Sequence, residues 1–163
     1  MDLTAHPIPP LYNEASKVLI LGSFPSVKSR EAQFFYHHPQ NRFWKVISSV
    51  YQRPLPVTVE EKRAMLLDSN VAVWDVIKSC EITGSSDSSI RNVTANDITQ
   101  ILIDAQIGVI AANGNTAHRL YMKYIYPVTG REALKLPSTS PANAGFSMER
   151  LLEAWSCLRQ YTG

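Results

Sequence analysis

The 163-residue sequence is poor in cysteine, in long apolar runs and in net charge. Its two cysteines, Cys80 and Cys157, lie far apart without a Cys-x-x-Cys pair. This argues against a zinc knuckle or an iron–sulfur cluster and is typical of a reducing compartment. The apolar runs are strand-sized, and the N-terminus lacks the pattern of a signal peptide. We therefore expect a cytoplasmic protein with no membrane partner.

The formal net charge is only +2, which is too small to establish a nucleic-acid partner. The distribution of charge is more informative than its total. Residues 28–45 and 114–136 each carry four cations against one glutamate. These cations are Lys28, Arg30, Arg42 and Lys45, followed by Arg119, Lys123, Arg131 and Lys135. Two interpretations stay open, a single phosphate-binding face or ordinary solvated surface.

Apolar periodicity predicts an alternation of strands and helices. We expect strands at 17–21, 71–76, 107–112 and 133–136. We expect helices at 42–51, 58–68, 115–124 and 147–161, and another from Thr94 or Asn96 to 104. Thr58 and Glu61 have the spacing of a capping box. The order predicts an α/β fold, a three-layer sandwich around a short, mostly parallel four-stranded sheet, in one domain over 1–163.

In open α/β sheets, ligands bind beyond the carboxyl ends of the strands. Four segments follow the predicted strands, at 22–41, 75–92, 113–118 and 137–145, and all are rich in polar residues, glycine or proline. The first lacks the glycines of a dinucleotide-binding turn and the Gly-Lys-Ser/Thr of a P-loop. We therefore expect no nicotinamide cofactor and no nucleoside triphosphate, and predict no cofactor.

Aromatic residues are concentrated between 34 and 44, in a presumed loop and the start of a helix. They could form a satellite core, or a ring that stacks on a flat ligand such as a base. The neighbours His37 and His38 have no acidic residue close in sequence, so we predict no metal site. Asn41 lies directly before the helix predicted to begin at residue 42, so its side chain could instead serve as the N-cap of that helix.

The segment 137–145 contains two prolines and three hydroxyl side chains just before the last predicted helix. Such a loop can grip a phosphate or place a small wedge in a nucleic acid. Loops rich in serine and proline are common, so this segment alone is a weak indicator.

Together, three runs resemble the signature motifs of the uracil-DNA glycosylase superfamily: Gly-Ser-Phe-Pro-Ser at 22–26, His-Pro-Gln-Asn-Arg-Phe-Trp-Lys-Val-Ile at 38–47, and Leu-Pro-Ser-Thr-Ser-Pro-Ala-Asn at 136–143. The second run is similar to the mismatch-specific uracil/thymine branch. The first run, with Trp-Asp-Val-Ile at 74–77 followed by Gly-Ser at 84–85, resembles the hypoxanthine-DNA glycosylase branch more closely. The resemblance extends in order from about residue 17 to 155.

The resemblance implies a single-domain, monofunctional glycosylase that removes a deaminated base from DNA, with hypoxanthine as the favoured base. The base would be flipped out and its N-glycosidic bond hydrolysed. No lysine matches a Schiff-base position, so no lyase step is expected. The mismatch-specific branch carries a water-positioning Asn where this chain has Phe24. In the hypoxanthine branch the catalytic residue is the Asn that corresponds to Asn41.

The resemblance also assigns hypothetical roles. Asn41 would orient the attacking water, or else serve only as a helix cap. Tyr36 would stack on the flipped base. Asp75 and Asn113 would read its edge, although both could instead be structural. The residues expected to line the base pocket are Ser23, Phe24 and Pro25. The residues expected to hold phosphates or fill the gap left by the base are Ser138, Ser140, Pro141, Ala142 and Asn143.

Three rival hypotheses remain. The protein could remove uracil or a mismatched base instead of hypoxanthine. It could be an inactive nucleic-acid-binding module, with Phe24 marking a lost water site. It could also act on free nucleosides, in which case its binding would not depend steeply on salt. We expect a monomer in each case.

Overall fold

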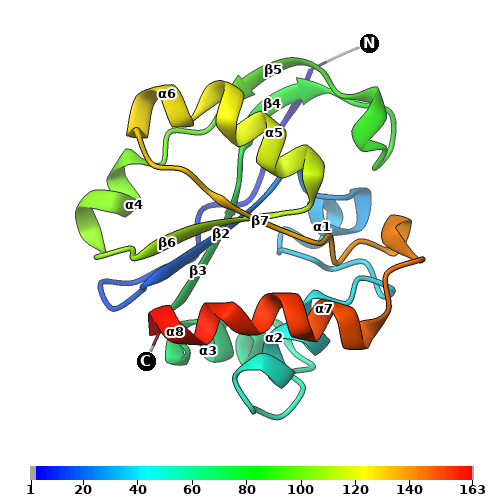
Figure 1. Ribbon diagram of the computed structural model, residues 1–163. Coiled ribbons are helices and arrows are strands. Elements are labelled where there is room, and N and C mark those ends of the chain that lie inside the picture. The colour runs from blue at the N-terminus through cyan, green and yellow to red at the C-terminus, as the bar shows by residue number, and fades with distance from the viewer. Residues whose placement is uncertain (1–2, 163) are drawn as a thin grey trace.

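A four-stranded parallel sheet forms the centre of the protein, as the computed structural model, which describes residues 3–162, shows (Figure 1). Its strands are β2 (Val18–Gly22), β3 (Val71–Asp75), β6 (Val109–Asn113) and β7 (Leu134–Leu136). They lie in the order β3-β2-β6-β7, and all three pairings are parallel. The predicted α/β fold around a four-stranded sheet is confirmed.

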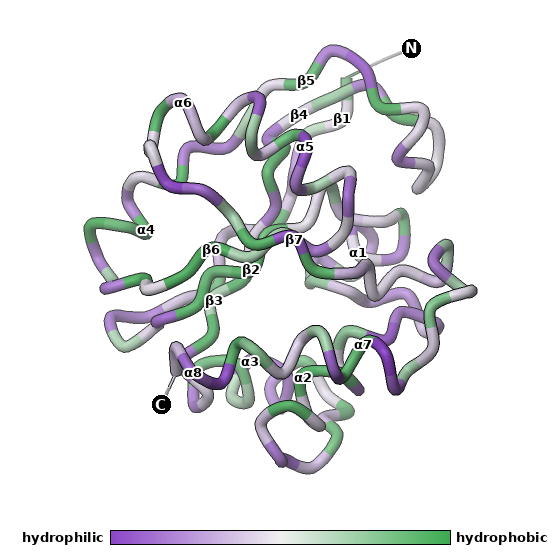
Figure 2. The backbone as a smooth tube through the Cα atoms, in the orientation of Figure 1, coloured by the Kyte–Doolittle hydropathy of each residue, from purple (hydrophilic) through white to green (hydrophobic). Residues whose placement is uncertain are grey.

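Strand β2 is apolar along its whole length because helices cover both faces of the sheet. Val18 and Ile20 belong to one core cluster, whereas Leu19 and Leu21 belong to another. Side chains alternate between the two faces of a strand, so each face contributes to its own core. In Figure 2 the tube through β6, β2 and β3 is mostly hydrophobic, as this arrangement requires.

The helices form layers on the two faces of the sheet (Figure 1). The helices of one layer are α2 (Phe43–Val50), α3 (Val59–Asp68), α7 (Met148–Trp155) and α8 (Arg159–Thr162). Those of the other are α4 (Thr99–Asp104), α5 (Asn115–Tyr124) and α6 (Tyr126–Thr129). The short α1 (Val27–Ala32) follows β2. Within residues 3–162 there are also three 3-10 turns, at Asp87–Ser89, Pro141–Asn143 and Ser156–Leu158.

The predicted capping box at the start of α3 is confirmed. The Thr58 hydroxyl accepts from the backbone N–H of Glu61 at 3.1 Å, and the Glu61 carboxylate accepts from the backbone N–H of Thr58 at 2.9 Å. These bonds pair two N–H groups that the helix itself leaves free.

A second, antiparallel sheet lies beside the first, and the sequence patterns did not predict it. It consists of β1 (Thr4–Ala5), β4 (Ile77–Glu81) and β5 (Arg91–Ala95), in the order β1-β4-β5. Because β5 occupies residues predicted as the start of a helix, the expected cap at Thr94 is wrong. The cap at Asn96 is also wrong, since that side-chain amide donates to the carbonyl oxygens of Asp75 and Ile77 at 2.9 and 3.1 Å.

The parallel register brings the carboxyl ends of the central strands together. Gly22 pairs with Asp75 across β2 and β3, and Asn113 pairs with Leu136 across β6 and β7. The segments that follow these strands therefore meet at one edge of the sheet. Within residues 3–162, no helix combines the length and apolar character needed to cross a membrane.

Candidate functional site

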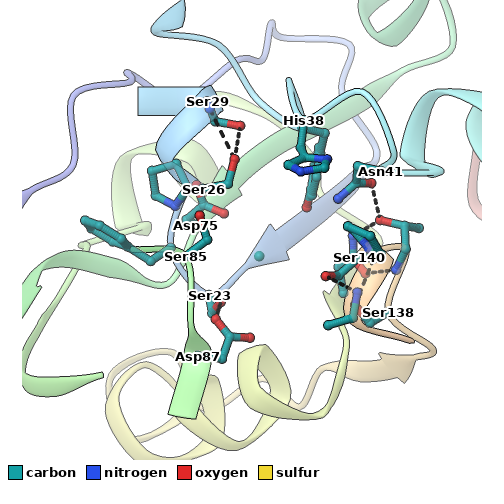
Figure 3. Close-up of a pocket in the computed structure, with 18 of the residues that line it drawn as sticks. Ser23, Ser26, Ser29, His38, Asn41, Asp75, Ser85, Asp87, Ser138 and Ser140 are labelled. Carbon is teal, nitrogen blue, oxygen red and sulfur yellow. Dashed lines mark hydrogen bonds between the residues drawn. The ribbon is translucent and has the colours of Figure 1, made fainter. Parts of the chain in front are cut away.

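A cavity of about 520 Å³ opens at the carboxyl ends of the central strands (Figure 3). This size falls within the range of ordinary ligand sites, roughly 300 to 1,000 Å³. All four predicted segments contribute to its wall. The predicted site residues that line it are Ser23, Phe24, Pro25, Tyr36, Asn41, Asp75, Asn113, Ser138, Ser140, Pro141 and Ala142. Asn143 is not among the lining residues.

The floor of the cavity is a close contact between Gly22 and the Asp75 carboxylate. A Cβ atom at Gly22 would lie only 2.4 Å from Asp75 Oδ1 and 3.1 Å from the Tyr36 hydroxyl. Such a separation from Oδ1 is far below van der Waals contact, so these two side chains occupy the space that a larger residue would need. The Asp75 carboxylate and the Tyr36 hydroxyl therefore leave room only for glycine at the end of β2.

Asp75 is buried and is held by His6, a residue that no sequence pattern indicates. His6 Nε2 lies 2.7 Å from Asp75 Oδ2, and both side chains are nearly inaccessible. The backbone N–H of Ile8 donates to His6 Nδ1 at 3.1 Å, so Nδ1 carries no proton. The imidazole is therefore neutral and donates its Nε2–H to the carboxylate, which leaves Oδ1 of Asp75 toward Gly22 and the cavity.

Tyr36 places a buried hydroxyl beside this carboxylate. The backbone at Tyr36 has a φ of 49°, and its ring stacks on Phe43 with centroids 4.0 Å apart. One ring face is thereby covered, so a base could stack only on the other. Burial, and next the nearby Asp75 charge, raise the Tyr36 pKa far above its ordinary value. The hydroxyl thus stays protonated, and it has no partner of good geometry among residues 3–162.

Asn41, Thr139 and Asn113 form a continuous hydrogen-bond network along the cavity wall. Asn41 Oδ1 accepts from the Thr139 hydroxyl at 2.8 Å and from the backbone N–H of Phe43 at 2.9 Å. Asn113 accepts from the Thr139 backbone N–H at 3.1 Å and donates to its hydroxyl at 3.0 Å. Asn41 therefore both supports the start of α2 and lines the cavity.

The hydroxyl groups of the loop after β7 are engaged with the loop's own backbone. Ser138 Oγ accepts from the N–H of Ser140, and Ser140 Oγ accepts from the N–H of Ala142. The Asn143 amide donates to the Ser138 carbonyl oxygen at 3.0 Å. These bonds hold the loop in shape, and each serine hydroxyl keeps its own proton as a donor.

The turn between β4 and β5, within the predicted segment 75–92, supplies a further wall, although no role was assigned to its individual residues. It contributes Asp87, whose carboxylate accepts from the Ser23 hydroxyl at 3.0 Å, together with three serines at 85, 86 and 88. Asp87 is exposed, yet partial desolvation raises the pKa of its carboxyl above the ordinary value; the Ser23 bond lowers this pKa, and the nearby Asp75 charge raises it. Arg119 lies close enough to lower this pKa as well.

Two of the cations considered for a phosphate-binding face instead form hydrogen bonds to backbone carbonyl oxygens of the protein itself. The Arg42 guanidinium donates to the carbonyl oxygens of Phe146 and Asn143 at 2.5 and 3.0 Å. Arg30 donates to the Gly84 carbonyl at 2.9 Å and lies over the Phe24 ring. These arginines tie loops together around the cavity. The cavity wall itself has no lysine or arginine among its described lining residues.

No cluster of three or more His, Cys, Asp or Glu side chains suited to a metal ion occurs within the part of the chain described, 3–162. Three residues important to the geometry were missed from the sequence. Asp87 lies in a segment that was expected to carry chemistry, and Thr139 lies between two selected serines. His6 had no local signal, because only the tertiary fold brings β1 beside Asp75.

Comparisons with known proteins agree with this architecture. The family model of the Uracil DNA glycosylase superfamily matches residues 9–159. A "Hypoxanthine DNA glycosylase" of Methanosarcina acetivorans is 33% identical over 87% of this chain and 90% of its own length. A protein of the same name from Methanosarcina barkeri is 30% identical over 83% and 85%, respectively.

A solution NMR structure from Methanosarcina acetivorans, described as that of a candidate uracil DNA glycosylase, has a similar fold. Its TM-score is 0.82 at 30% sequence identity, and the match covers 96% of this chain and 97% of that one. The match to the family model extends over nearly the whole chain and includes all four strands of the parallel sheet. The chain belongs to the uracil DNA glycosylase superfamily.

Proposed function

We propose that this protein is a monofunctional DNA glycosylase that removes a deaminated base, with hypoxanthine as its preferred substrate. The observation that carries the proposal is the convergence of Tyr36, Asn41, Asp75 and Asn113 around one cavity at the strand ends. A base inside a duplex cannot reach such a cavity, so it must be flipped out of the stack. The similarity to two relatives named for hypoxanthine supports the choice of base.

The cavity offers the groups that this reaction requires. Hydrolysis of the bond between C1′ and the base passes through an oxocarbenium-like state, with negative charge growing on the base. The Tyr36 hydroxyl and the Asn113 amide are donors for that base, whereas the Asp75 carboxylate is an acceptor for a base N–H. Asn41 orients the attacking water. No lysine lines the cavity within the described residues, which supports simple hydrolysis without a lyase step.

The loop at 137–145 is proposed to contact the DNA backbone. The protons of the Ser138 and Ser140 hydroxyls remain available for phosphate oxygens. Pro141 and Ala142 lie at the rim, where they would fill the space that the flipped base leaves. Asn143 acts indirectly in this scheme, since its amide already supports Ser138. The proposal extends to a single domain that acts as a monomer in the cytoplasm.

Base excision from defined duplexes tests this function. The protein is incubated without metal or nucleotide on duplexes with one deoxyinosine or one deoxyuridine, and alkali then cuts the abasic sites. We expect cleavage at inosine, with a loss of about 100-fold or more in Asn41→Ala, the size seen when a preorganised polar group is removed. Lys78→Ala, an exposed change in β4 outside the cavity and both basic segments, is the control variant.

Each other outcome has a distinct meaning. Cleavage at uracil alone would assign the protein to the uracil or mismatch-directed branch. Cleavage that Asn41→Ala leaves unchanged would reduce Asn41 to its helix-start role. Absence of cleavage, with salt-sensitive DNA binding intact, would indicate a binding module that has lost the reaction.

A further inference from the structure

The orientation of the Asn41 amide follows from groups whose donor or acceptor character is not in doubt. A backbone N–H can only donate, so the Asn41 atom 2.9 Å from Phe43 N must be the oxygen. The same reasoning at Thr139 N fixes the oxygen of Asn113, 3.1 Å away. These backbone donors therefore determine which terminal atom of each side-chain amide is oxygen and which is nitrogen.

Thr139 then transmits this orientation from one amide to the other. Since Asn113 directs its NH2 group at the Thr139 hydroxyl, that hydroxyl accepts at 3.0 Å and must give its own proton to Asn41 Oδ1 at 2.8 Å. The Thr139 carbonyl accepts from the backbone N–H of Arg42 at 3.0 Å. The residue is fully buried, with its hydroxyl, N–H and carbonyl all paired.

Asn41 therefore has one polar group left for a ligand. Both lone pairs of its Oδ1 are used by Phe43 and Thr139. Its NH2 group makes no hydrogen bond to residues 3–162, and Asn41 lines the cavity. Figure 3 shows the amide oxygen on the side of the loop that follows β7, along the dashed bond.

We infer that Thr139 is a positioning residue that locks Asn41 with its amide nitrogen toward the cavity, so that Asn41 acts in catalysis only as a hydrogen-bond donor. This inference rests on the proposed glycosylase function. Asn41 can orient water by donating to the water oxygen, but it cannot accept the water's proton. Such a site suits a reaction in which the bond to the base is largely broken before water attacks.

Exchange of Asn41 for aspartate separates a donor from an acceptor. The introduced carboxylate would still accept from Phe43 and Thr139, so the start of α2 is preserved, but it would offer no N–H to the cavity. We expect Asn41→Asp to lose about 100-fold or more in single-turnover rate at neutral pH. We expect part of this loss to be recovered as the pH falls, when the carboxyl group becomes a donor.

Exchange of Thr139 tests the lock itself. Thr139→Val keeps the shape but removes both hydroxyl bonds, and we expect a loss of about tenfold or more in kcat with little change in KM. Thr139→Ser restores the hydroxyl and should recover most of that loss. Thr94→Val, an exposed change in β5 away from the cavity, is the matched control for the Thr-to-Val exchange.

Three results would overturn the inference. One is an Asn41→Asp variant with a rate close to that of the unmodified protein or faster, which would make Asn41 an acceptor. The second is a Thr139→Val variant with unaltered kcat. The third is a Thr139→Ser variant that folds but recovers none of the lost activity.

A second readout keeps the failure of this inference distinct from failure of the proposed function. The side-chain amide resonances of Asn41 and Asn113 are followed by 1H–15N NMR without DNA. Both should shift in Thr139→Val and return toward their original positions in Thr139→Ser. If the unmodified protein cleaves no deaminated base, the proposed function fails, while unshifted resonances in Thr139→Val would refute the lock by itself.

Discussion

At the residue scale, Gly22 shows how one missing side chain determines the arrangement of the cavity floor. The space beside its Cα is occupied by the Asp75 carboxylate and the Tyr36 hydroxyl. His6 holds the other oxygen of that carboxylate, so Asp75 cannot easily move away. The carbonyl oxygen of Gly22 also accepts from the N–H of Val76 at 2.8 Å, which restrains the position of the Gly22 backbone.

We predict that Gly22→Ala destabilises the protein by about 1–3 kcal/mol, the usual cost of forcing extra atoms into packed space. Displacement of Asp75 should also lower base-excision activity. Gly108→Ala is the matched control, because its added Cβ would meet neighbours only at ordinary contact distances of 3.6 and 3.8 Å. Urea unfolding measures both variants, and equal stability of the two would contradict this account of the cavity floor.

Individual site residues were predictable where a motif, a strand end or both marked them. Asp75 was selected on both grounds, Asn41 on its motif alone and Asn113 on its strand end alone, and all three line one cavity. The alternatives considered for Asn41 are compatible, because its oxygen supports the helix start while its nitrogen remains for the cavity. The importance of Thr139 could not be predicted, since its bonding depends on partners 26 and 98 residues away in sequence.

At the scale of elements, Arg42 joins the start of α2 to the loop that follows β7. Its guanidinium binds two carbonyl oxygens of that loop, and its backbone N–H binds the carbonyl of Thr139. Asn41, just before α2, and the loop both line the cavity, so their relative position affects the shape of the cavity. A planar guanidinium can reach two separated acceptors at once, which a lysine cannot do equally well.

We predict that Arg42→Met, which keeps the apolar stem, lowers the free energy of unfolding by about 2 kcal/mol through loss of charged hydrogen bonds. The amides of 138–146 should exchange faster with solvent, and base excision should decrease. Lys78→Met, an exposed change in β4 outside both basic segments, should leave all three quantities nearly unaltered. Unchanged exchange in Arg42→Met would show that the loop is held by other contacts.

The central strands were predictable because strands that are buried along almost their whole length, such as β2 and β3, appear in the sequence as short apolar runs. The small sheet was not, because β4 has only two buried residues, β5 has none, and register shifts interrupt their pairing. Asn96 was misassigned for a related reason. Its type suits a helix cap locally, but its tertiary partners are strand carbonyls 19 and 21 residues earlier.

At the scale of the whole molecule, protonation of Asp87 in the cavity wall affects the free energy of unfolding of the protein. Exclusion of water raises its pKa above the ordinary value of 3.8, so the folded state disfavours the charged carboxylate. Between 3.8 and the raised value the folded state binds more protons than the unfolded state. Stability therefore falls as the pH rises through that window.

Asp97 provides a comparison of the opposite sign. It lies just before α4, where bonds from Thr99, first its side chain and then its backbone N–H, lower the Asp97 pKa. Its stabilising contribution is present at neutral pH and is lost as the pH falls through the lowered value. The same substitution at the two positions should thus change stability in opposite directions.

We predict that Asp87→Asn raises the urea midpoint at pH 7, and that the gain disappears below pH 3.8, whereas Asp97→Asn lowers the midpoint at pH 7. A carboxylate retained in a binding cavity at a cost in stability is expected where function needs it. Single-turnover base excision by Asp87→Asn should accordingly decrease while its stability increases. A variant that is more stable and fully active would show that the turn between β4 and β5 only encloses the cavity, and that recognition depends on the strand-end residues alone.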